Sequence, residues 1–169
     1  QSEQELELIP LEDLTFVDRV DKDAGANGAV HRAVLRGVID VAVKTAKGEP
    51  DRIEDVIRLL GKEIVQCQRL HHVNIVQFLG ACRGKPPIPG TWPGEQLMLV
   101  NELMAISLFE QFQLLRDKRK SIGWVCAVKW AYNVACGMEH LHHRKLNHLD
   151  LKSANVLLSG AGNSSTGRL

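Results

Sequence analysis

The sequence lacks the features of a membrane-spanning or nucleic-acid-binding protein. No apolar run reaches the roughly 18 residues that a transmembrane helix needs, and the most apolar long stretch, Ile122 to Met138, is interrupted by Lys129. The 21 Lys and Arg residues nearly balance 20 Asp and Glu, leaving a formal net charge of +1. The segment Gln1 to Glu7 is polar and acidic, unlike a signal peptide. We therefore expect neither a membrane nor a nucleic acid as a partner.

Cysteine is also scarce, with four residues in the chain of 169 and no Cys-x-x-Cys pair. These are Cys67, Cys82, Cys126 and Cys136. All four lie among apolar neighbours, where a free cysteine behaves as a small hydrophobe. This pattern argues against a disulfide-stabilised scaffold and predicts a reducing, cytoplasmic compartment.

The remaining composition is that of an ordinary globular protein, with 44% apolar and 24% charged residues. The apolar patterns predict strands, then a helix, then strands, then helices, which indicates an α+β fold with a sheet-rich first part and a helical second part. Strands are expected at 14–17, 30–35, 38–43, 74–79 and 96–100, with loops at 21–28 and 85–94. The second and third strands, separated by Arg36-Gly37, are expected to form a hairpin.

Helices are expected after Asp51, after Leu108 and around residues 124–141. Asp51 and Glu54 have the spacing of a capping box with Asp51 in the cap role. The last helix has an apolar stripe made of Trp124, Ala127, Ala131, Val134, Ala135, Met138 and Leu141.

Three features of the first half could serve nucleotide binding. Gly25 and Gly28, followed by Val30, would let backbone N–H groups approach phosphate oxygens, although most such pairs are plain hairpin turns. Lys44 ends the apolar strand Val41-Ala42-Val43, where an ammonium needs a partner or must reach water. Glu63 on the following helix could be that partner, or it could be a solvated surface residue.

The most specific pattern is the string His148-Leu149-Asp150-Leu151-Lys152-Ser153-Ala154-Asn155, placed between a helix and a strand. Asp150 could accept a hydroxyl proton, Lys152 could neutralise a γ-phosphate, and Asn155 could hold a metal ion. Together with the three preceding features, this string indicates phosphoryl transfer.

In this order the four patterns resemble the eukaryotic protein kinase domain over about residues 11 to 160. Supporting similarities are His72-Val73-Asn74-Ile75-Val76, Leu79-Gly80-Ala81-Cys82 and Met138-Glu139-His140-Leu141-His142. The segments Leu11 to Phe16 and Leu151 to Ser153 are similar to the tyrosine-kinase-like group, including mixed-lineage and Raf-type kinases. The resemblance implies a signal-transducing transferase that phosphorylates protein Ser/Thr with ATP and Mg²⁺.

The resemblance also implies a domain plan. Residues 1–10 would lead into an antiparallel N-terminal lobe with one long helix at 11–100, and residues 101–107 would form a hinge. A partial helical C-terminal lobe would follow at 108–169.

Site roles are implied residue by residue. Lys44 would contact the α- and β-phosphates and pair with Glu63, beneath a loop containing Gly25 and Gly28. Val30 and Ala42 would touch the adenine, Asn101 would be the gatekeeper, and the backbone of Glu102 to Met104 would pair with the adenine edge. Asp150 would be the catalytic base, with Lys152 at the γ-phosphate and Asn155 on Mg²⁺.

The sequence departs from the kinase pattern at several positions. Asp23 and Asn27 replace a glycine and an aromatic residue in the glycine-rich loop, Asn101 is a polar gatekeeper, and Leu149 replaces the arginine of His-Arg-Asp. No Asp follows Asn155, so the Asp-Phe-Gly metal ligand is not found. These departures predict a truncated domain that transfers phosphate poorly and leaves the 124–141 stripe partly uncovered.

Two alternatives belong to other functional classes. A pseudokinase or scaffold that binds partners without catalysis would explain Leu149 and the reduced glycine loop. A metal site built from His140, His142, His143 and His148 is weaker, because no cysteine or carboxylate lies at ligand spacing.

Overall fold

A computed structural model describes residues 6, 8–19, 28–47, 51–88, 93–160 and 167–168. Gly25, Asp23 and Asn27 of the expected glycine-rich loop lie outside the described residues. The chain forms two compact units, the first comprising Gln1–Leu70 and Phe78–Leu103, the second His71–Gln77 and Met104–Leu169.

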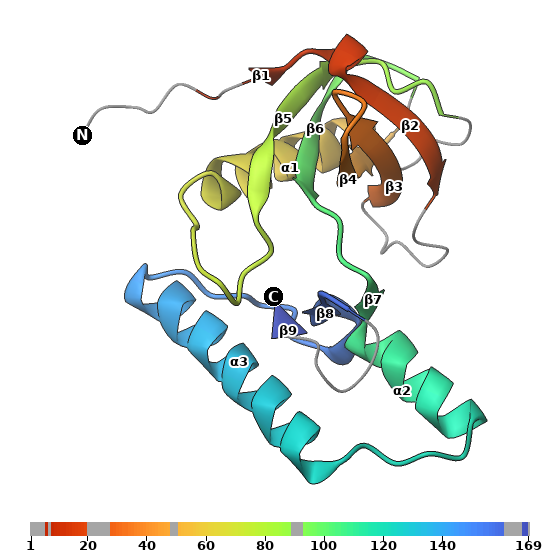
Figure 1. The fold of residues 1–169 in the computed structure, drawn as a ribbon. Coiled ribbons are helices and arrows are strands. Elements are labelled where there is room, and N and C mark those ends of the chain that lie inside the picture. The colour runs from red at the N-terminus through yellow and green to blue at the C-terminus, as the bar shows by residue number, and fades with distance from the viewer. Residues whose placement is uncertain are drawn as a thin grey trace. The chain divides into compact units, whose positions relative to one another are not determined.

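The first unit contains a six-stranded sheet with the order β1-β5-β6-β4-β3-β2 (Figure 1). Its strands are β1 (Leu8–Ile9), β2 (Leu14–Arg19), β3 (Gly28–Leu35), β4 (Ile39–Ala46), β5 (Phe78–Gly84) and β6 (Gln96–Glu102). All neighbouring pairs are antiparallel except β1 and β5, which are parallel. The short helix η1 (Leu11–Asp13) links β1 to β2, and α1 (Ile53–Cys67) contacts β4 and β6. The predicted α+β class is confirmed.

The predicted hairpin at Arg36-Gly37 is confirmed as the β3–β4 turn. Both residues have positive φ, 51° and 72°, and the Val38 N–H donates to the Leu35 carbonyl at 3.2 Å. A turn with two positive-φ central residues matches the twist of the strands that it joins, and glycine adopts that conformation without strain.

The sheet is apolar on both faces, which explains why its central strands read as near-continuous apolar runs. One face carries the largest core cluster: Ile9, Leu14, Ala33, Leu35, Val41, Val43, Cys82, Met98 and Val100. On the other face, Leu60 and Ile64 of α1 pack with Ala81 and Leu99. Successive residues of a strand point to opposite faces, so Lys44, next to Val43, lies on the α1 side.

The second unit combines helices with a small sheet of order β7-β8-β9. Its elements are β7 (Ile106–Ser107), α2 (Leu108–Asp117), α3 (Trp124–His143), η2 (Ser153–Asn155), β8 (Leu157–Leu158) and β9 (Gly167–Arg168). Cys126 and Trp130 of α3 pack with Leu158 in its core. The backbone N–H groups of Ala105 and Leu108 donate to Leu158 and Val156, which fixes η2 and β8 beside the start of α2.

Two predicted boundaries are wrong. The N-cap of α1 is Arg52, without a side-chain capping bond, so Asp51 lies one residue too early and Glu54 falls at the second helical position. The strand expected at 74–79 begins only at Phe78 and runs to Gly84. Before it, the Ile75 N–H donates to the His72 carbonyl, and this turn competes with strand pairing for the apolar segment.

The long helix α3 buries a different face from the predicted stripe. Its buried residues are Cys126, Trp130, Gly137 and Leu141, of which only Leu141 belongs to the stripe. Within the stripe, Trp124 is 76% exposed, and Ala127, Ala131 and Ala135 are also exposed. Beside it, Val125, Val128 and Tyr132 are exposed as well. The expectation that the stripe is partly uncovered is therefore confirmed. No helix in the described part of the chain is long and apolar enough to cross a membrane.

A capping box that the sequence reading missed fixes the start of α2. The Ser107 Oγ accepts from the Glu110 N–H at 3.2 Å, and the Ser107 N–H donates to the Glu110 carboxylate at 2.8 Å. The Ser-x-x-Glu spacing before an apolar run is the sequence signal for this motif.

Ser107→Ala removes the side-chain half of this box. We expect a loss of about 1 kcal/mol, which lowers the melting temperature by roughly 2–4 °C in a chain of this size. Thermal unfolding followed by circular dichroism measures it. Ser121→Ala, at an exposed position before α3, is the control and should leave the melting temperature unchanged. Equal shifts for both variants would contradict the capping role.

Candidate nucleotide and phosphoryl-transfer site

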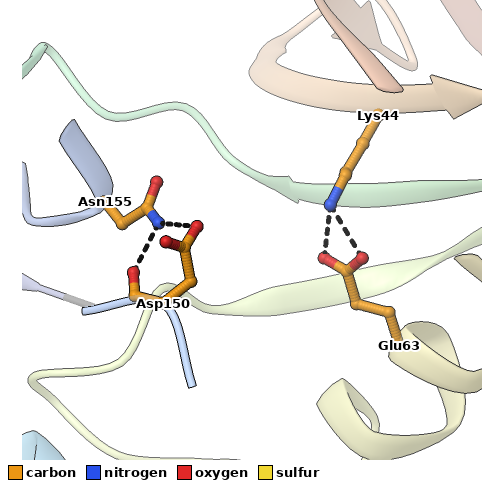
Figure 2. Close-up of polar contacts among 4 residues, drawn as sticks. All are labelled: Lys44, Glu63, Asp150 and Asn155. Atoms are coloured by element: carbon orange, nitrogen blue, oxygen red, sulfur yellow. Dashed lines mark hydrogen bonds and ion pairs between the residues drawn. The ribbon is translucent and has the colours of Figure 1, made fainter. Parts of the chain in front are cut away.

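The predicted partnership of Lys44 and Glu63 is confirmed in the first unit. The Lys44 Nζ donates to both carboxylate oxygens of Glu63, at 2.8 Å and 2.7 Å (Figure 2). The two side chains are 34% and 40% exposed, so the pair is partly shielded from water. A bidentate ion pair of this kind holds the ammonium in one position on β4 while leaving one side of it accessible.

Glu63 reaches Lys44 because of its register on α1. The residues of α1 that pack on the sheet include Leu60 and Ile64, and Glu63 lies between them on the same side of the helix. Helical periodicity therefore brings a carboxylate to the position of β4 that carries a cation.

Strand register gathers further predicted site residues on the Lys44 face. Val30 of β3 and Leu99 of β6 lie directly opposite Lys44, and Ala42 lies opposite Asn101. Directly opposed residues of an antiparallel pair share a face of the sheet. The predicted adenine contacts Val30 and Ala42 are partly buried. Leu99 was missed, although it could have been found by aligning the strand 96–100 with Lys44.

Gly28 begins β3 and lies close to Lys44. A Cβ atom at Gly28 would sit 3.1 Å from the Thr45 carbonyl oxygen and 3.3 Å from the Lys44 Cε. A side chain here would therefore press on the Lys44 stem. The companion residue Gly25 lies outside the described residues.

The gatekeeper candidate Asn101 carries a polar atom in an apolar place. Its Oδ1 is buried without a hydrogen-bond partner among the described residues. Such an acceptor costs about 1–3 kcal/mol relative to a solvated one. The neighbouring hinge candidates differ in burial, because Glu102 is half-buried at the end of β6 and Met104 is buried in the second unit.

Cys67 lies one helical turn after Glu63 but is not a reactive group. Burial, and next the Glu63 carboxylate, raise the pKa of the Cys67 thiol to about 11. The thiol is therefore neutral near pH 7, and neutral thiols are poor nucleophiles. All four cysteines are free, as expected.

In the second unit, Asp150, Lys152 and Asn155 come together in one loop. The Asn155 Nδ2 donates to the Asp150 carbonyl at 2.8 Å and to the Asp150 Oδ2 at 2.9 Å (Figure 2). The Lys152 Nζ lies 2.9 Å from the same Oδ2. The short helix η2 makes this possible, because its turn brings Asn155 back toward the loop, and the Asn155 N–H donates to the Lys152 carbonyl.

These contacts set the charge of Asp150. The hydrogen bond from Lys152, and next the one from Asn155, hold the pKa of the Asp150 carboxyl below its ordinary value. The side chain is exposed and ionised at neutral pH. Asn155 makes both contacts to Asp150 through Nδ2, so its Oδ1 takes no part in them. Among the described residues, no three His, Cys, Asp or Glu side chains form a metal-binding group, so the alternative histidine site is not formed.

The residue between His148 and Asp150 has a strained backbone. Leu149 has a φ of 60°, and the Asp150 N–H donates across it to the His148 carbonyl at 2.9 Å. A hydrogen bond from the N–H of one residue to the carbonyl two positions earlier, around a central residue with positive φ, is a γ-turn of the rare, strained type. The Leu149 side chain is 92% exposed, and His148 is only partly buried.

Residues 19–164 match the family described as protein tyrosine and serine/threonine kinase. This chain belongs to the protein kinase family.

Similar proteins support a serine/threonine group within that family. The chain is 30% identical to "Probable serine/threonine-protein kinase drkC" of Dictyostelium discoideum, over 91% of this chain and 19% of that protein. It is 34% identical to "Serine/threonine-protein kinase CTR1" of Arabidopsis thaliana, over 89% of this chain and 17% of that protein. It is 33% identical to "Receptor like protein kinase S.3" of Arabidopsis thaliana, over 79% of this chain and 36% of that protein. The kinase-family chain thus spans well under half of each of these relatives.

The pKa of the Asp150 carboxyl should report its ion pair with Lys152. Because Lys152 holds the carboxylate in its ionised form, Lys152→Met should raise the pKa of Asp150 toward its ordinary value. The loop's stabilisation is present above that value and is lost as the pH falls through the lowered pKa. Carboxyl ¹³C NMR titration measures the shift. Lys129→Met on α3 is the matched control and should leave the Asp150 titration unchanged.

Relieving the γ-turn should stabilise this kinase-family chain. Leu149→Asn places a residue that tolerates positive φ at an exposed position. We expect a gain of about 1 kcal/mol, or roughly 2–4 °C in melting temperature. Leu151→Asn in the same loop lacks a positive φ and should give no gain. A destabilised Leu149→Asn variant would show that the leucine is not strained.

Proposed function

We propose that this kinase-family chain binds ATP with Mg²⁺ and transfers the γ-phosphoryl group to serine or threonine of a protein substrate. The observation that carries the proposal is the bidentate contact between Lys44 and Glu63, made by two residues 19 positions apart that the family pattern pairs. Its family match and its serine/threonine kinase relatives support the same reaction.

In the first unit, the Lys44 face of the sheet would receive the nucleotide. Glu63 orients the ammonium, which attracts the α- and β-phosphates. Gly28 leaves room beside that ammonium, and Gly25 would complete the phosphate loop. Val30 and Ala42 offer apolar surface to the adenine, Asn101 lies at the back of the site, and the backbone from Glu102 to Met104 pairs with the adenine edge.

In the second unit, the Asp150 loop would receive the acceptor hydroxyl. Asp150 is ionised and can accept that hydroxyl's hydrogen bond and proton. Lys152 offers a positive charge for the γ-phosphate, and Asn155 holds the Asp150 carboxylate in position through Nδ2. In-line transfer depends mainly on such positioning and charge neutralisation.

The described residues fit one protein contact to Mg²⁺. Asn155 Oδ1 is a hard oxygen ligand, and Mg²⁺ beside a nucleotide commonly takes only one or two protein ligands together with phosphates and water. The metal supplies charge neutralisation on the phosphates when bound.

The proposal extends to the cellular setting. The four free cysteines favour a reducing, cytoplasmic environment, and the exposed apolar face of α3 around Trp124 favours contact with a protein partner.

The second candidate is a pseudokinase that binds partners without catalysis. Leu149 favours it, because an exposed leucine cannot hold the phosphate that the family's arginine receives on an activation loop. The ionised Asp150 with its Lys152 and Asn155 contacts favours the enzyme.

Nucleotide binding is tested by thermal shift. ATP·Mg²⁺ at about a hundredfold excess over its dissociation constant should add roughly 2.7 kcal/mol of stability and raise the melting temperature. Lys44→Met should abolish the shift, whereas Lys62→Met, an exposed lysine of α1, should preserve it. An identical shift in Lys44→Met would refute the assigned site.

Phosphoryl transfer separates the two candidates. With radiolabelled ATP and a generic protein substrate, we expect slow incorporation that Asp150→Asn removes and that Asp117→Asn, an exposed control on α2, leaves intact. If the chain binds ATP but any incorporation is the same in the unmodified chain and in Asp150→Asn, the pseudokinase is favoured. Robust transfer would contradict the sequence-based expectation of weak activity.

A further inference from the structure

Two histidines from distant parts of the sequence stack inside the second unit. The rings of His72, in the 71–77 segment, and His140, in α3, have centroids 4.8 Å apart and planes inclined by 24°. The 71–77 segment belongs to the second unit although the residues on both sides of it belong to the first. The ring pair is thus a contact by which this segment attaches to α3.

Both rings are suited to their surroundings only when they are neutral. The His72 Nδ1 accepts a hydrogen bond from the Asn74 N–H at 3.2 Å, which requires that nitrogen to carry no proton. The His140 Nε2 is buried without a hydrogen-bond partner among the described residues, so a charge there would be poorly solvated.

Basic side chains lie around His140. His72 faces His140 from the 71–77 segment, and Arg144 and His143 act on it from α3 itself. Glu139 is the nearest described carboxylate on that helix, but its contact is with His143, at 3.9 Å. Burial and these neighbours lower the pKa of His140 below its ordinary value.

We propose that the stacked pair His72–His140 is an acid-sensitive latch that holds the 71–77 segment on α3 when both rings are neutral and releases it when they are protonated. Protonation of His72 turns the acceptor of the Asn74 N–H into a donor and breaks the turn. Protonation of both rings places two positive charges on rings whose centroids are 4.8 Å apart, and these charges repel each other. The latch is independent of the proposed kinase activity.

The direction of the effect follows from the His140 environment. Released His140 titrates at its ordinary value, whereas stacked His140 resists protonation until a lower pH. The latch is therefore fully closed above the ordinary histidine value and weakens as the pH falls toward the lowered one.

Amide hydrogen exchange on the full chain tests the latch. The reporters are the Asn74 and Ile75 amides, which donate to the Nδ1 and the carbonyl of His72. Protection factors, corrected for intrinsic rates, should fall about tenfold between about pH 7.5 and about pH 5.5. His140→Phe keeps a stacking ring that cannot be protonated, so its protection should fall clearly less over this pH range, through His72 alone. His142→Gln, an exposed histidine of α3, should behave like the unmodified chain.

A second measurement requires no variant. The NMR titration of the His140 ring in the unmodified chain should report a pKa below the ordinary histidine value. Protection that stays constant with pH, an equal fall in His140→Phe, or a His140 pKa at or above the ordinary value would each overturn the latch.

Discussion

A cation on a sheet that is apolar on both faces is the constraint on which the candidate site depends. The strand that carries Lys44 packs one set of side chains into the main core and the other toward α1. An ammonium on the α1 side needs a carboxylate, and the helix provides Glu63 between two packing residues. The same packing that stabilises the sheet therefore orients the charged group, so a shift of α1 along its axis would alter both.

The Asp150 loop of the second unit is ordered by hydrogen bonding instead of burial, and it contains a strained turn. Asp150 is exposed, yet its carboxylate is held by Lys152 and Asn155 and preceded by a strained turn at Leu149. Strained turns persist only where surrounding contacts determine them, and they occur often at functional loops. The strained turn and the three interacting polar side chains support the proposal that this loop receives the acceptor hydroxyl.

Histidine contributes to the second unit in a different way. The His72–His140 contact joins two segments that lie far apart in the sequence, and its two rings are adapted to the neutral state. The exposed apolar residues of α3 lie on the opposite side of that helix from its buried face. A single helix thus combines a core face, a histidine contact and an open apolar face, which explains why its apolar pattern alone did not identify the buried side.

Local patterns were sufficient to predict the α+β class, the β3–β4 hairpin, the helix bearing Glu63 and the grouping of Asp150, Lys152 and Asn155, because these depend on residues close in sequence or on a family motif. The cap of α1, the turn at His72 and Ile75, and the buried face of α3 were not predictable in this way. The buried face of α3 depends on packing against Leu158 of a later strand, which the apolar pattern of the helix does not specify. The pairing of Leu99 with Lys44 and the stacking of His72 on His140 join residues more than fifty positions apart, so only tertiary structure decides them.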